Sequence, residues 1–203
     1  METRDAFKEA AEWFAGIVPT ARGRWEETGL GEWSIRDLVG HTSRALLTVE
    51  SYLDKPTTGI EVRSAVEYFR LMLAATSDSG SITQRGRDAG AALGDEPAIS
   101  VERILNRVLD RVYASDEDAL VATPVGDMYL VDYLPTRTFE LTVHTCDLAL
   151  VVEGLEQPLE VPKSAAMQSL SLLGELAIER GVAPSILLSM TGRQQLPFGF
   201  SIL

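Results

Sequence analysis

Apolar residues recur at steps of three and four positions along most of the chain, and this spacing constrains the fold more than any other feature. Side chains at such steps share one face of an α-helix, so each stretch predicts an amphipathic helix. Strand-like and helix-like segments do not alternate, which argues against a parallel sheet. The expected helices cover residues 3–18, 35–53, about 60–77, 100–114, 131–152, 164–180 and 184–191.

The helix expected at residues 35–53 has the clearest start signal in the chain. Ser34 and Asp37 resemble a capping box, with Asp in place of the usual Glu at the third helical position. Trp33, just before the cap, can pack on Leu38 as a hydrophobic staple. We therefore interpret Ser34 as a helix cap and not as a nucleophile.

The segments between and after these helices give weaker signals. Residues 78–97 are ambiguous, because the glycines there weaken a helix. Residues 121–126 are expected to be extended chain and turn, and residues 198–203 are expected to be β-like. Together these elements predict a mainly α protein, with a helical bundle over residues 1–152 and a small C-terminal α/β appendage over residues 153–203.

The composition excludes several classes of protein. The 203 residues are 45% hydrophobic and 24% charged, which is ordinary globular composition and excludes intrinsic disorder. A formal net charge of −12 argues against a nucleic-acid partner, since phosphate neutralisation needs a basic surface. No apolar run approaches the ~18–20 residues of a membrane helix, and the charged N-terminus does not resemble a signal peptide. The single cysteine, Cys146, excludes an intramolecular disulfide framework and fits a reducing compartment, so we expect a cytoplasmic protein.

The chain has two histidines, and one of them has carboxylates on its own helix face. Glu140 and His144 lie one turn apart, and Asp147 falls on the same face. His41 lies at the edge of the apolar stripe of another helix. A carboxylate and an imidazole one turn apart can bind one divalent cation, but the same spacing gives ordinary ion pairs on helix surfaces. A lone half-buried histidine such as His41 is often a hydrogen-bonded core residue, so the residues alone leave both interpretations open.

Three segments carry a family resemblance. Residues 33–41 read WSIRDLVGH, residues 140–149 read ELTVHTCDLA, and residues 187–193 read LLSMTGR. In this order the three segments resemble the signatures of the mycothiol-dependent maleylpyruvate isomerase family, within the DinB-like metalloprotein superfamily.

The resemblance implies an up-down-down-up four-helix bundle with a divalent metal site, zinc by expectation and nickel or another metal as the alternative. It implies that His41, Glu140 and His144 are the metal ligands. It also implies that Asp147 does not bind the metal and instead contacts one of the ligands or has a structural role. It implies a catalytic role for Arg193, in contact with the substrate or with the thiol. Cys146 is expected to pack in the interior and to point away from the site.

The function implied is that of a metal-dependent enzyme that uses mycothiol as a thiol cosubstrate, either an isomerase or an S-transferase. Its second substrate would be a small electrophile or a dicarboxylic keto acid. Two alternatives stay open: a metal-dependent hydrolase on the same bundle, and a non-catalytic metal-binding protein of regulation or stress response. A homodimer also stays open.

Overall fold

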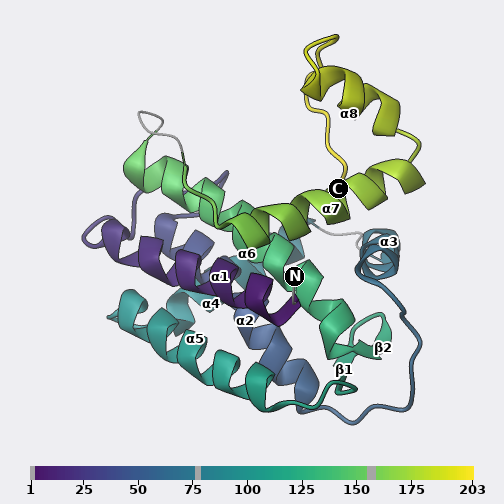
Figure 1. Ribbon diagram of the computed structural model, residues 1–203. Helices are drawn as coiled ribbons and strands as arrows, with labels where there is room; N and C mark the ends of the chain where they lie inside the picture. Colours follow the sequence, from purple (N-terminus) through teal and green to yellow (C-terminus); the bar gives the residue numbers. More distant parts are fainter. Residues whose placement is uncertain (1–2, 76–78, 155–158) are drawn as a thin grey trace.

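Four helices form a bundle in the computed structural model (Figure 1): α1 (Thr3–Ile17), α2 (Ile35–Leu53), α5 (Pro97–Ala114) and α6 (Leu130–Glu153). The structure describes residues 3–75, 79–154 and 159–203. Around the bundle the helices contact one another in the order α1, α6, α2, α5 and back to α1. The prediction of a mainly α protein built on a four-helix bundle is confirmed.

Polar contacts between helix ends show the directions of the four helices. Arg4, near the start of α1, donates to two carbonyls just after α5 at 2.9 and 3.0 Å, so α1 and α5 are antiparallel. Arg107 of α5 pairs with Glu50 of α2 at 2.7 Å, and Arg111, one turn later, pairs with Asp54 at the end of α2 at 2.5 Å. The two pairs advance in the same direction, so α2 and α5 are parallel. Arg24, shortly after α1, donates to the Val152 carbonyl near the end of α6 at 3.1 Å, so α1 and α6 are parallel. The order is therefore up-down-down-up, as the resemblance implied.

The start of α2 follows the predicted capping box. The Ser34 hydroxyl accepts a hydrogen bond from the Asp37 backbone N–H at 3.2 Å, and the Asp37 carboxylate accepts one from the Ser34 N–H at 3.1 Å. Two N–H groups that a helix start leaves unpaired are thus satisfied. The apolar stripes predicted from the sequence lie in the core, where the largest fully buried side chains include Phe7, Phe14, Ile35, Leu38, Leu46, Tyr133, Leu134 and Leu148.

Two helices lie beside the bundle, α3 (Ala65–Ala75) and α4 (Ser79–Ala92). The helix expected at about 60–77 is thus shorter at its start, and its last residues fall outside the described part of the chain. The ambiguous region forms α4, which packs closely on α2. A Cβ atom at Gly40 would overlap the backbone of Ala89 and Gly90, and one at Gly86 would overlap the ring of Trp33. A Cβ at Gly90 of α4 would come within 2.9 Å of Arg36 and Asp37 of α2. The glycines that weaken α4 in isolation are therefore what let it approach α2 and Trp33.

The connection between α5 and α6 is a hairpin of two antiparallel strands, β1 (Leu120–Thr123) and β2 (Gly126–Tyr129), which confirms the extended chain and turn expected there. In the tail, α7 (Lys163–Glu179) packs on α6 and α1, and α8 (Ala183–Met190) follows it. The β-like end expected at residues 198–203 is irregular instead. Among the described residues no strand pairs with it, so its backbone lacks the ladder that a strand requires. The division of the chain at residue 152 stays a prediction.

None of the helices in the described ranges combines the length and the apolar character that crossing a bilayer requires.

Gly40→Ala is expected to destabilise the protein by about 1–3 kcal/mol or more, because the added methyl would force α4 away from α2. Gly16→Ala in α1 is the matched control, since a Cβ there meets nothing within 4 Å. Its higher helix propensity should stabilise the protein by about 0.5–1 kcal/mol. Urea unfolding measures both changes, and equal midpoints for the two variants would contradict close packing of α2 on α4.

Candidate metal centre and its pocket

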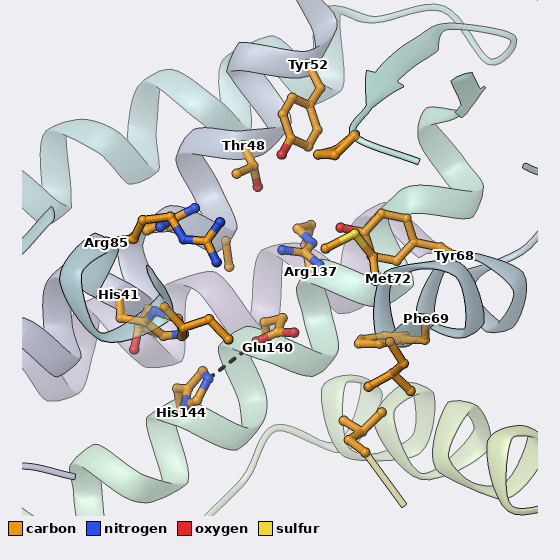
Figure 2. Close-up of a pocket in the computed structure, with 17 residues that line it drawn as sticks. His41, Thr48, Tyr52, Tyr68, Phe69, Met72, Arg85, Arg137, Glu140 and His144 are labelled. Carbon is orange, nitrogen blue, oxygen red and sulfur yellow. Dashed lines mark ion pairs between the residues drawn. The ribbon is translucent and has the colours of Figure 1, made fainter. Parts of the chain in front are cut away.

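Two bundle helices bring the predicted site residues together. His41 lies on α2, and Glu140 and His144 lie one turn apart on α6 (Figure 2). One nitrogen or oxygen atom from each of the three residues lies within 4.8 Å of those of the other two. His144 Nε2 is 3.4 Å from a Glu140 carboxylate oxygen, and the ring centroids of the two histidines are 4.9 Å apart. Residues almost one hundred positions apart in the sequence thus form one half-buried cluster.

Neighbouring side chains hold the two imidazole rings in place. Asp147 Oδ2 lies 3.0 Å from His144 Nδ1, so the carboxylate orients that ring with its other nitrogen toward Glu140. The ring of Trp33 packs on that of His41 with centroids 4.4 Å apart. Trp33 is itself fixed by a hydrogen bond of 3.0 Å from its indole N–H to the Thr83 carbonyl of α4. Both rings are therefore oriented from outside the cluster.

The two histidines have opposite charge preferences in the metal-free chain. Burial, and then the charge of His144, lower the pKa of His41 from its ordinary 6.5 to about 4. Burial also acts to lower the pKa of His144, but hydrogen bonds with Asp147 and Glu140 outweigh it and raise that pKa to about 9. For Glu140, burial acts to raise the pKa, and the bond with His144 and the charge of Arg137 bring it below its ordinary value. At neutral pH His41 is uncharged and has a free nitrogen lone pair.

His41 also lacks the contact that a core histidine normally makes. Its Nδ1 atom is buried and has no hydrogen-bond partner among the described residues. A buried polar atom without a partner costs about 1–3 kcal/mol. The interpretation of His41 as a hydrogen-bonded core residue therefore finds no support at this atom.

The cluster faces a pocket of about 350 Å³. Residues of α2, α3, α4 and α6 line it, and the apolar part of its wall includes Phe69, Met72 and Ile82. A volume of this size suits a small organic molecule. The site therefore has three groups that could hold a metal ion and, beside them, a cavity large enough for a small molecule.

The pocket also contains three arginines that the sequence analysis did not single out: Arg44, Arg85 and Arg137. Two of them had a signal in the sequence. Arg44 lies three residues after His41 and Arg137 three residues before Glu140, so each shares a helix face with a cluster residue. Arg85 had no such signal, because the helix that carries it was not recognised.

The structure does not bring Arg193 to this pocket. It lies on an exposed turn just after α8, which extends away from the bundle (Figure 1), and it contacts the Thr191 carbonyl at 3.5 Å. Its role in binding substrate or thiol stays a prediction. Cys146 is half-buried and does not line the pocket. Burial, and then the charge of Asp147, raise the pKa of its thiol, which reduces the thiolate fraction that a nucleophile needs.

Fold and site together define a protein of the DinB-like class, a four-helix bundle with a His–Glu–His cluster between two of its helices. A model of the mycothiol maleylpyruvate isomerase N-terminal domain matches residues 4–149, and the chain belongs to this family. The matched range contains the whole cluster and Asp147, while Arg193 lies outside it. Comparison with curated proteins and with solved structures gives no significant match.

Asp147→Asn is expected to lower the pKa of His144 from about 9 toward 6.5, because it removes a carboxylate that favours the charged ring. Two-dimensional NMR of chelator-treated protein measures this directly, since the chain has two histidines and hence two ring signals to follow. Asp132→Asn, on the same helix more than three turns away, should leave both titrations unchanged. An unchanged His144 titration in Asp147→Asn would contradict the contact.

Proposed function

We propose that this protein is a metal-dependent enzyme of thiol chemistry, in which His41, Glu140 and His144 bind a divalent cation. The observation that carries the proposal is the approach of these three donor groups to within 4.8 Å of one another beside a pocket of about 350 Å³. Two imidazoles and one carboxylate are a donor set of catalytic zinc sites, which keep a further position open. Zinc is the proposed metal, with nickel or another divalent ion as the alternative.

The residues present fit such an ion in three respects. The buried Nδ1 of His41 has no partner within the described chain, as expected if this ring serves a group other than the protein. Its low pKa keeps it neutral, which is the form that binds metals. The Asp147 carboxylate contacts Nδ1 of His144, the ring nitrogen that faces away from Glu140. Carboxylates commonly orient metal-binding histidines in this way.

The chemistry follows from family membership and from the position of the cysteine. A bound divalent cation would lower the pKa of a thiol or water molecule that joins it. Because Cys146 does not line the pocket, the reactive thiol has to come from a dissociable cosubstrate, and the family points to mycothiol. In the isomerase reaction this thiol adds to a cis double bond, the adduct rotates about the resulting single bond, and elimination of the thiol returns the trans product. In an S-transferase the thiol stays on the electrophile.

The chain's own side chains contribute binding and exclusion of water. The apolar wall formed by Phe69, Met72 and Ile82 displaces solvent from the substrate, which strengthens polar contacts at the floor of the pocket. A protein that only stores or senses metal needs no such pocket, so the pocket favours catalysis over the regulatory alternative. Arg193 stays a proposed contact for substrate or thiol.

His41→Ala and His144→Ala are each expected to lower metal affinity by at least about tenfold, since each removes one of three ligands. Elemental analysis of the purified proteins measures this loss. Cys146→Ala is the matched control: it removes the thiol from the same turn of α6 and should retain wild-type metal content. Equal metal content in the wild type and both histidine variants would disprove the site.

Metal-loaded protein is expected to convert maleylpyruvate, or to conjugate small electrophiles, only when mycothiol is present. Mass spectrometry of the products separates isomerisation from S-transfer, and the His144→Ala variant should abolish either. Turnover that continues without any thiol would instead favour the hydrolase, which would use water at the same cluster. Bound metal without turnover of either kind would favour the non-catalytic alternative.

A further inference from the structure

The pocket beside the cluster concentrates positive charge within an acidic protein. Arg44, Arg85 and Arg137 line it, and Glu140 is the only acidic side chain among the described residues of its wall. They come from three different helices, α2, α4 and α6, and Figure 2 shows Arg85 and Arg137 reaching into the same space. The chain as a whole carries 18 basic and 30 acidic residues, so such a grouping runs against its composition.

None of these three arginines forms an ion pair within the described residues. Six arginines elsewhere in the described residues do, with carboxylates 2.5–3.5 Å away. Burial, and then the charge of Arg85, lower the pKa of the Arg44 guanidinium, as expected for a half-buried cation beside a second cation. The arginines that do form pairs are Arg24, Arg36, Arg70, Arg87, Arg107 and Arg111.

Arg137 is the most constrained of the three, with only 9% of its surface exposed. Its guanidinium lies over the ring of Tyr133, 5.0 Å from the centroid, and over that of Tyr68 at 5.6 Å. Its Nε donates to the Thr136 hydroxyl at 2.9 Å. These contacts fix the plane of the guanidinium, while its two terminal nitrogens have no hydrogen-bond partner among the described residues. The guanidinium is thus held in one orientation beside the pocket, with terminal nitrogens that are available to bind a ligand.

We infer that Arg44, Arg85 and Arg137 form a binding site for a carboxylate group of the substrate, next to the His41–Glu140–His144 cluster. The planar fork of a guanidinium matches the two oxygens of a carboxylate. Arg137 offers a rigid contact at the floor and Arg85, which is exposed, a movable one at the entrance. The inference rests on the proposed function in taking this pocket as the substrate site. It assigns anion recognition to the bundle itself and not to Arg193.

Isothermal titration of metal-loaded protein with maleate, without any thiol, tests this inference. Arg44→Gln and Arg85→Gln are each expected to weaken maleate binding by at least about tenfold at unchanged metal content, since each removes a charged hydrogen-bond donor. Arg87→Gln is the matched control, because Arg87 lies on α4 two residues from Arg85 and pairs with Glu32 at 3.5 Å outside the pocket. Its affinity should equal that of the wild type. Arg137→Lys, which keeps the charge and loses the fork, should also bind more weakly.

Equal maleate affinity in the wild type, Arg44→Gln and Arg85→Gln would overturn the inference. So would a wild-type protein that binds no maleate, or one that binds the neutral dimethyl ester equally well. Sulfate binding as tightly as maleate would overturn the assignment to a carboxylate. Because the titration involves no thiol and no turnover, failure of the thiol reaction leaves its result standing, and failure of the titration leaves the metal and thiol experiments standing.

Discussion

The packing of α2 against α6 determines the functional part of this protein. Near one end of the contact the Tyr133 hydroxyl donates to the Thr48 hydroxyl at 3.0 Å, and near the other the rings of His41 and His144 meet edge to face. Because the two helices are antiparallel, the early turns of α2 lie beside the late turns of α6. Arg44, one turn after His41, then faces the same space as Arg137, one turn before Glu140. The His41–Glu140–His144 cluster and two of the three pocket arginines are both brought together by the way α2 packs on α6.

α6 can bring polar side chains into the interior because several of its buried hydroxyls form hydrogen bonds within the helix. The helix contacts α1, α2, α3 and α7, so it has little solvent-facing surface. The hydroxyls of Thr138 and Thr142 donate to carbonyls four residues earlier at 3.1 and 2.7 Å. Such bonds let polar side chains enter a core without leaving donors unpaired. The polar face of α6 is therefore retained in the interior, where the cluster needs it.

The sequence predicted best what depends on local signals. The start of α2 follows from Ser34 and Asp37, whose capping contacts involve only neighbours in the chain. The grouping of Glu140, His144 and Asp147 follows from helix geometry. His41 could be predicted as their partner because it is the other of the two histidines in the chain. What the sequence could not supply is how separate helices meet. α4 is stabilised by glycine contacts with α2, so local propensity underestimated it, and the pocket arginine that α4 carries was missed with it.

The contrast between surface and pocket bears on how an anion would be recognised. The net charge of −12 means that the summed electric field of the protein repels an anion that is still far from its surface. Solvent ions screen that repulsion within about 10 Å, so it does not exclude an anion that has reached the pocket mouth. Inside the pocket, where less water is present, hydrogen bonds and charge contacts with the guanidinium groups outweigh the repulsion from the distant acidic residues. Selectivity would then come from the fit of a carboxylate to fixed groups such as Arg137, and not from long-range attraction. This is the behaviour expected of a site whose charges are confined to one cavity while the remaining surface stays acidic.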